Sequence, residues 1–168
     1  GWARKQLTAW DASSAHLKNI MGQEGKLTQQ LYETARRNPQ RVVFAEGIHP
    51  TMLKAAVEAR NEGICHPILL GNDEMIAKKA AELELSLEGI EIINLRHDRE
   101  APRRERFAQI LAEKRARQGY TFEEANDKMF ERNYFGMMMV ETGEADAFIT
   151  GVYTKYSNTI KVAKEVVE

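Results

Sequence analysis

The chain has 168 residues, of which 43% are hydrophobic and 29% are charged, and its formal net charge is −1. This composition is typical of a soluble globular protein with a core of its own. The balanced charge excludes strong electrostatic attraction to nucleic acid or to an anionic membrane surface, and no apolar run approaches the roughly 18 residues of a membrane helix. The single cysteine, Cys65, excludes an internal disulfide and favours a reducing, cytoplasmic compartment.

The first residues form the least regular part of the chain. Trp2 and Trp10 stand in an otherwise polar stretch, which predicts a connector over residues 1–25. The chain opens without a methionine and ends at Glu168 within a helical pattern. We therefore expect it to be a piece of a longer polypeptide.

From residue 26 onward the apolar residues follow regular periods. Leu27, Leu31 and Ala35 are four residues apart, which predicts one face of a helix that ends at Asn38 before a proline. Short apolar runs then alternate with segments of helical period. Strands that are apolar on both faces and alternate with helices form parallel sheets, so we predict an α/β fold with helices on both faces of the sheet. The predicted strands are residues 41–46, 66–71, 90–94 and 146–150.

Ligands of such folds bind beyond the carboxyl ends of the strands. This rule singles out the segments that follow the predicted strands, at residues 46–49, 71–73, 94–96 and 151–154. No Gly-x-Gly-x-x-Gly follows a strand, so nothing predicts a dinucleotide site. The 4 histidines include no pair at helical spacing, and we predict no metal site. We interpret His49 as a turn residue, with a position facing a ligand as the alternative.

Two further patterns have a functional and a structural interpretation. The segment 96–117 is rich in arginine with interleaved acidic residues. These arginines either bind phosphate or form a solvated helix face with ion pairs, and we favour the second interpretation. The three methionines at 137–139 form either an adaptable binding surface or part of the core, and helical spacing favours the core for two of them.

One longer segment resembles a known family. Residues 135–151 read Phe-Gly-Met-Met-Met-Val-Glu-Thr-Gly-Glu-Ala-Asp-Ala-Phe-Ile-Thr-Gly. This is similar to the phosphate acetyltransferase pattern, a helix ending in Met-Met-Val, then Gly and Ala-Asp, then a strand ending in Ser/Thr-Gly. Further pieces lie in family order: Arg-Val-Val-Phe-Ala-Glu-Gly at 41–47, Pro-Ile-Leu-Leu-Gly at 67–71, and Arg-Ala-Arg-Gln-Gly-Tyr-Thr at 115–121, where Gln118 replaces a lysine.

The resemblance covers about residues 38–161 and implies a fold. That fold is a three-layer α/β/α domain with a mainly parallel sheet, as in isocitrate dehydrogenase. The resemblance also assigns residues 26–151 to the first domain of the family unit and residues 152–168 to the start of the second domain. The family moves an acetyl group between coenzyme A and phosphate. Its catalytic Asn-Asp-Leu-Ser-Arg motif is expected beyond Glu168, so the resemblance implies no catalytic residue in this chain.

One stretch departs from the family pattern. The family has Ser-Thr-Ala-Asp-Thr-Leu-Arg where this chain has Lys-Tyr-Ser-Asn-Thr-Ile-Lys at 155–161. Asn158 replaces the aspartate, and Lys161 replaces the arginine, which removes the bidentate fork. The Thr-Lys-Tyr at 154–156 resembles the variant in bacterial hybrid malic enzymes. Their C-terminal phosphate-acetyltransferase-like domain is regarded as a regulatory domain that senses acetyl-coenzyme A.

The resemblance therefore implies a fragment of this regulatory domain in an NADP-dependent malic enzyme, which converts malate to pyruvate by oxidative decarboxylation. A stand-alone phosphate acetyl- or butyryltransferase is the alternative, and a non-catalytic oligomerisation module is the third interpretation. NADP and Mg²⁺ or Mn²⁺ are expected in the attached malic enzyme domain and no cofactor in this chain. A homo-oligomer is expected, with neither nucleic acid nor a membrane as partner.

A ligand site also follows from the resemblance. Arg115 and Lys161 match family positions and are expected to bind the phosphates of acetyl-coenzyme A or an acyl phosphate. Tyr156 and Ser157 are expected to line the same pocket, beyond the fourth strand. The alternative is that Arg115 is a solvated helix residue and that Lys161 faces water.

Overall fold

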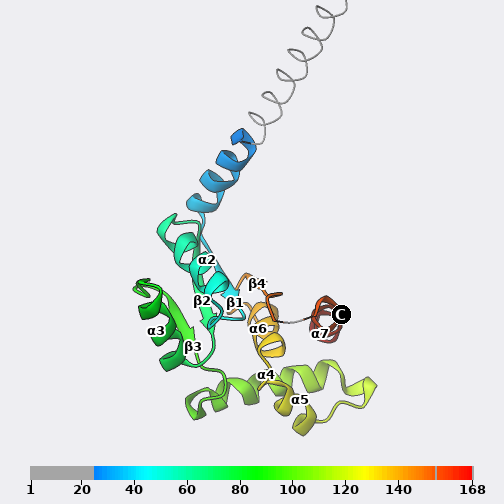
Figure 1. The fold of residues 1–168 in the computed structure, drawn as a ribbon. Coiled ribbons are helices and arrows are strands. Elements are labelled where there is room, and N and C mark those ends of the chain that lie inside the picture. The colour runs from blue at the N-terminus through cyan, green and yellow to red at the C-terminus, as the bar shows by residue number, and fades with distance from the viewer. Residues whose placement is uncertain (1–24, 154, 168) are drawn as a thin grey trace, which may run out of the picture. The chain divides into compact units, whose positions relative to one another are not determined.

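The computed structural model describes residues 25–153 and 155–167 (Figure 1). The predicted connector over residues 1–25 lies almost entirely outside this described part, and the side chain of Tyr156 lies outside it too. Within the described residues, no helix combines the length and the apolarity that are needed to cross a membrane.

The chain divides into two units, residues 1–38 and residues 39–168. In the first unit, residues 25–37 form the helix that the spacing of apolar residues predicts. Leu27 and Leu31 on its apolar face are 58% and 62% exposed. All the other elements belong to the second unit.

A parallel sheet of four strands forms the centre of the second unit. The strands are β1 (Gln40–Phe44), β2 (Cys65–Leu70), β3 (Glu91–Ile93) and β4 (Ala147–Ile149), in the spatial order β3-β2-β1-β4. All three pairings are parallel. The predicted sheet is confirmed, with shorter or slightly shifted strands. The third strand begins late because the N–H of Ile90 donates to the carbonyl of Leu87 in a turn, at 3.0 Å.

Helices cover both faces of the sheet, as predicted (Figure 1). On one face lie α2 (Pro50–Asn61) and α3 (Asp73–Glu82). On the other face lie α4 (Ala101–Lys114), α5 (Phe122–Lys128), α6 (Arg132–Glu141) and α7 (Tyr156–Val167). Two short 3₁₀ helices, η1 (Asp98–Glu100) and η2 (Ala116–Gln118), flank α4.

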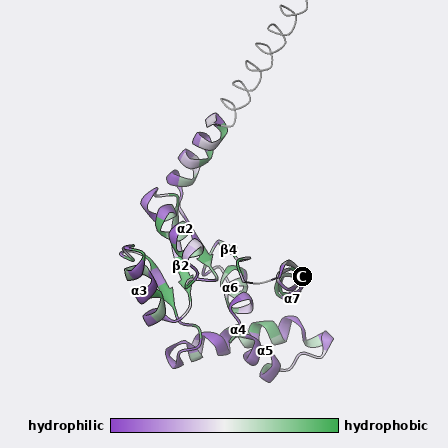
Figure 2. Ribbon diagram, viewed as in Figure 1, coloured by the Kyte–Doolittle hydropathy of each residue, from purple (hydrophilic) through white to green (hydrophobic). Residues whose placement is uncertain are grey.

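Alternation along the strands produces a core on each face, because successive strand residues point to opposite sides. Phe44 and Leu69 pack with α2 and α3, whereas Val43 and Ile68 pack with the helices of the other face. Figure 2 shows the hydrophobic colour on β2 between helices that are mainly hydrophilic in colour. The three-layer α/β/α architecture follows directly from this alternation.

Polar side chains cap two of these helices. Asn72 caps α3, and its Oδ1 accepts from the N–H of Met75 at 3.0 Å. Thr121 and Glu124 form a capping box at the start of α5.

The helix α6 lies against the sheet at a glycine. A Cβ atom at Gly136 would lie 2.3 Å and 2.6 Å from two ring carbons of Phe148, so only glycine allows this close contact. The three methionines at 137–139 are all buried, whereas helical spacing favoured the core for two of them.

Candidate ligand-binding cavity

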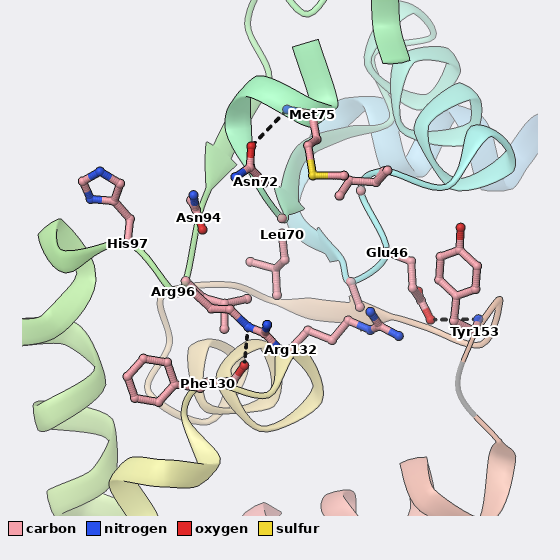
Figure 3. A pocket seen from close by; sticks show the side chains of 15 residues that line it. Glu46, Leu70, Asn72, Met75, Asn94, Arg96, His97, Phe130, Arg132 and Tyr153 are labelled. Atoms are coloured by element: carbon pink, nitrogen blue, oxygen red, sulfur yellow. Dashed lines mark hydrogen bonds between the residues drawn. The ribbon is translucent and has the colours of Figure 1, made fainter. Parts of the chain in front are cut away.

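A cavity of about 740 Å³ opens at the carboxyl ends of the strands (Figure 3). The segments that follow the four strands all contribute to its wall, through Glu46, Asn72, Arg96 and Tyr153. The sequence singled out these same segments. The strand order also reverses here, because the chain runs from β1 to β2 and β3 on one side and returns to β4 on the other. Open α/β sheets bind ligands at such a switch point.

Glu46 is a buried carboxylate at this edge, with 3% of its surface exposed. Its Oε1 accepts from the Thr150 hydroxyl at 2.8 Å, and from the N–H groups of Gly151 at 3.1 Å and Tyr153 at 3.5 Å. Its Oε2 has no hydrogen-bond partner among the described residues. One oxygen of Glu46 therefore holds the segment after β4, and the other is left unsatisfied.

The position of Glu46 depends on the glycine that follows it. The N–H of Gly47 donates to the carbonyl of Leu70 at 3.1 Å. A Cβ atom at Gly47 would lie 2.8 Å from that oxygen, so a side chain there would push the turn away from β2. The glycine thus keeps Glu46 at the carboxyl edge of the sheet.

A cationic group lines the cavity at the start of α6. Arg132 is the first residue of this helix, and Glu131 before it makes no side-chain cap. The guanidinium carbon of Arg132 lies 5.6 Å from the ring centroid of Tyr153, and this guanidinium makes no ion pair or hydrogen bond within the described part of the chain. Figure 3 shows the Arg132 side chain running along the wall towards Glu46 and Tyr153. The positive end of the helix and the free guanidinium together favour an anion here.

The arginine-rich segment divides between surface and core. Arg99 and Arg103 form ion pairs with Asp73 and Glu100, in agreement with the favoured interpretation. Arg104, in contrast, is buried and donates from Nη1 to the carbonyls of Leu95 at 2.6 Å and His97 at 2.9 Å. This buried guanidinium supports the part of the cavity wall that follows β3.

His49 occupies the turn after β1, as expected. Its Nδ1 accepts from the N–H of Thr51 at 3.2 Å and caps α2. No group of three or more histidine, cysteine, aspartate or glutamate side chains within the described residues is placed to hold a metal ion.

The four residues predicted to bind a ligand lie around α7. Arg115, Ser157 and Lys161 do not line the cavity. Ser157 and Lys161 are exposed, and Nζ of Lys161 lies 3.9 Å from Oε1 of Glu165. Arg115 is buried, so it is not the solvated helix residue that the alternative interpretation describes. A role of these residues in binding acetyl-coenzyme A stays a prediction.

Arg115 instead caps the end of α7. Its Nε donates to the carbonyl of Glu165 at 2.6 Å, and its Nη2 donates to the carbonyl of Lys164. The neighbouring Lys114 donates to the carbonyls of Val166 at 2.7 Å and Val167 at 3.0 Å. The last carbonyls of a helix have no partner within it, and these cations also suit its negative end.

Glu165 joins α7 to the rest of the second unit. Its Oε2 accepts from the hydroxyls of Tyr120 and Tyr134 and lies 3.5 Å from Nζ of Lys128. Burial alone would raise the pKa of Glu165, but the hydrogen bonds from Tyr120 and Tyr134 outweigh it and lower that pKa. Burial and the hydrogen bond to Glu165 raise the pKa of Tyr134, so its hydroxyl stays protonated and donates.

A three-layer α/β/α domain with an open parallel sheet and a cavity at its carboxyl edge is an α/β protein of the kind that binds ligands at this edge. The family model described as "Phosphate acetyl/butaryl transferase" matches residues 26–168. The chain belongs to this family, as its sequence motifs predict.

Several named proteins are similar to this chain. An NADP-dependent malic enzyme of Rhizobium meliloti (strain 1021) is 29% identical over 171 residues, which cover 100% of this chain and 22% of that protein. A phosphate acetyltransferase of Corynebacterium glutamicum is 33% identical, covering 82% of this chain and 41% of that protein. The structure of the EutD phosphotransacetylase from Staphylococcus aureus superposes with a TM-score of 0.70 at 26% sequence identity, covering 83% of this chain and 42% of that chain. The chain thus spans less than half the length of these relatives.

The sequence did not identify the most informative residues of the cavity. Glu46 appeared there only within the segment 46–49 after the first strand and within a family turn, and its own role was not predicted. Nothing in the sequence marked Arg132, because its place beside Tyr153 depends on how α6 packs. The arginine run did not mark Arg104 as buried, and Arg115 was singled out as a ligand-binding residue rather than as a buried one.

Proposed function

We propose that this chain is part of the phosphotransacetylase-like regulatory domain of an NADP-dependent malic enzyme and that this domain senses acetyl-coenzyme A. One observation supports the proposal. The malic enzyme relative aligns with 100% of this chain, including the residues before residue 26, where the family match begins. A phosphate acetyltransferase of Nitratidesulfovibrio vulgaris aligns with 94% of this chain, so the same observation also supports the second candidate below. In this proposal, NADP and Mg²⁺ or Mn²⁺ belong to the attached malic enzyme domain.

The proposed effector site lies at α7. Lys161 and Ser157 are exposed on this helix. In this proposal they bind the effector together with Tyr156. Arg115 contributes by holding the end of α7, through its bonds to the carbonyls of Lys164 and Glu165. A bound effector changes activity only through a coupling free energy, typically about 1–3 kcal/mol.

At positions 158 and 161 this chain differs from the family pattern, and both differences argue against fast acetyl transfer. Lysine at 161 offers a point charge where the family pattern has the planar fork of an arginine. Asn158 removes a negative charge from the same run. We propose that acetyl transfer by the intact domain is weak or absent.

A stand-alone phosphate acetyl- or butyryltransferase is the second candidate. Several relatives bear the name phosphate acetyltransferase, among them the Corynebacterium glutamicum protein at 33% identity. An oligomerisation module without ligand is the third. In each case we propose a cytoplasmic homo-oligomer, and the lone, half-buried Cys65 suits a reducing compartment.

The full-length protein that contains this chain separates these candidates. Malate-dependent NADPH formation is measured while acetyl-coenzyme A is titrated, and acetyl transfer from acetyl phosphate to coenzyme A is measured in parallel. We expect malate oxidation that responds to acetyl-coenzyme A, with little or no transfer. Efficient transfer without malate oxidation would instead establish the second candidate. Malate oxidation that acetyl-coenzyme A leaves unchanged would contradict the regulatory role.

A further inference from the structure

We propose that Glu165 is a positioning residue of the effector site on α7, because its carboxylate pairs with the ammonium of Lys161 and an anionic effector must take the place of that carboxylate in order to bind. The inference rests on the proposed function, since Lys161 belongs to the proposed effector site. It adds a residue that the family resemblance does not mark. In this inference Lys161 favours binding of the effector and Glu165 opposes it.

The two oxygens of the Glu165 carboxylate have different surroundings. Oε2 accepts from the hydroxyls of Tyr120 and Tyr134 and lies 3.5 Å from Nζ of Lys128. Oε1 lies 3.9 Å from Nζ of Lys161, one helical turn earlier on α7. One oxygen therefore anchors the side chain, and the other is placed beside the ammonium of the effector site.

The carboxylate is the fixed member of this ion pair. The side chain of Glu165 is 20% exposed, whereas that of Lys161 is 68% exposed. The backbone of Glu165 is held as well, because its carbonyl accepts from Nε of Arg115 at 2.6 Å. An anion that arrives from solvent therefore reaches the ammonium of Lys161, and the carboxylate stays behind in its cluster.

The cluster also keeps Glu165 charged. Burial raises the pKa of Glu165, but the hydrogen bonds from Tyr120 and Tyr134 outweigh it and lower that pKa below its usual range. The carboxylate is therefore ionised at neutral pH. A fixed negative charge thus stands beside the cation that is proposed to bind the phosphates of the effector.

The ion pair is weak enough for a ligand to displace. Lys161 precedes Glu165 at i,i+4, which is the less favourable order of the two charges on a helix. Ion pairs with an exposed member contribute little, because water and salt screen them. Phosphate oxygens, in contrast, make short charge-assisted bonds with an ammonium. Glu165 therefore raises the effector concentration that is needed without preventing binding.

A purely structural role of Glu165 predicts the opposite effect. If the carboxylate only holds α7 in place, its neutralisation loosens the helix and weakens effector binding. If it competes for Lys161, its neutralisation strengthens effector binding, even where the stability of the protein falls. The sign of the change therefore separates the two roles.

Glu165→Gln measures this sign in the full-length protein. Its amide oxygen keeps the bonds from the two tyrosine hydroxyls, so the NH₂ group takes the place of Oε1 beside Lys161. We expect the acetyl-coenzyme A concentration for half the effect on malate-dependent NADPH formation to fall about 2- to 5-fold. Val166→Ala is the matched control, because it loosens the buried face of α7 and keeps the carboxylate. It should leave that concentration unchanged or raise it. An unchanged or higher concentration in Glu165→Gln would overturn the inference.

Two further measurements test whether Glu165 acts through Lys161. In the Lys161→Ala background, Glu165→Gln should bring no gain, and an undiminished gain would refute the contact between the two residues. Salt provides the second measurement, because the screening length falls to about 3 Å at 1 M. The gain of Glu165→Gln should vanish at this ionic strength, and a gain that salt leaves unchanged would contradict an electrostatic cause.

A second variant keeps the test decisive if Glu165→Gln alone does not fold. The double substitution Lys128→Met and Glu165→Gln removes both charges of their ion pair, so no unpaired cation is left in the cluster. The same 2- to 5-fold gain, roughly, is expected. A wild-type protein without any response to acetyl-coenzyme A would contradict the proposed function and this inference with it. A wild-type protein that responds, with no gain in either variant, would contradict this inference alone.

Discussion

Nε of Arg115 lies 2.6 Å from the carbonyl oxygen of Glu165, across 50 residues of chain. A residue that family resemblance places at a ligand site therefore completes the hydrogen bonding of a helix end. The side chain of the same glutamate accepts from Tyr120 and Tyr134. One residue of α7 is thus bound through both its backbone and its carboxylate, which ties this helix to Arg115, Tyr120 and Tyr134.

The first prediction concerns Arg115. Arg115→Ala leaves the carbonyls of Lys164 and Glu165 without their buried donor. We expect the free energy of unfolding to fall by about 2–4 kcal/mol in urea titrations. Arg117→Ala, an exposed neighbour, should change it by less than about 0.5 kcal/mol. Equal stability of the two variants would show that the cap does not stabilise α7.

The second prediction concerns pH. The pKa of Glu165 is lowered in the folded state from an ordinary value of 4.5. Its contribution to stability is therefore complete above pH 4.5 and is lost as the pH falls through the folded pKa. Glu165→Gln has no such proton to bind, so its free energy of unfolding should decline less steeply below pH 4.5 than that of the wild type. Denaturant titrations across acidic pH measure this slope, and the exposed Glu105→Gln should keep the wild-type slope.

The third prediction concerns the contact between α6 and β4. Gly136→Ala places a methyl group within 2.6 Å of the Phe148 ring. We expect a loss of about 1–3 kcal/mol in the free energy of unfolding, because the core has no room for it. Gly25→Ala adds a methyl group to a helix where nothing lies within 4 Å, and it should not destabilise the protein. Adding Phe148→Leu to the Gly136 variant should restore part of the loss, and a further loss would argue against this contact.

The fourth prediction concerns regulation by Lys161. In the full-length protein, Lys161→Ala should weaken the response to acetyl-coenzyme A by roughly 5- to 150-fold in effector concentration. Basal malate oxidation and the melting temperature should stay near wild type, because the side chain is 68% exposed. Lys155→Ala, which removes an exposed lysine just before α7, is the control. Superimposable effector curves for the wild type and the Lys161 variant would remove this residue from the site.

The fifth prediction concerns the altered run of the family pattern. The double substitution Asn158→Asp and Lys161→Arg restores the family residues at both positions. If they limit transferase chemistry, acetyl transfer in the full-length protein should rise by roughly 10- to 100-fold, measured by thioester absorbance. Lys155→Arg serves as the control. An unchanged rate would show that other differences suppress the reaction.

The fold was predictable because its signals are local. Val43 and Phe44 are neighbours in a run that is apolar on both faces, and such runs predict a buried parallel strand wherever they occur. The gathering of polar segments at one edge follows from the parallel sheet itself. The roles of Arg115 and Glu46 were not predictable in this way. Their partners lie 50 and about 105 residues away in sequence, and only packing brings them together.

The place of β4 in the sheet has a consequence for the order of folding. β1 pairs with β2 after a short crossover, whereas its other edge pairs with β4, and the N–H of Arg41 bonds to Asp146 across 105 residues. During synthesis, one edge of β1 therefore stays open until β4, about 105 residues further along the chain, has left the ribosome. Open strand edges invite pairing between chains. We expect this interval, rather than the finished domain, to be the stage most exposed to aggregation.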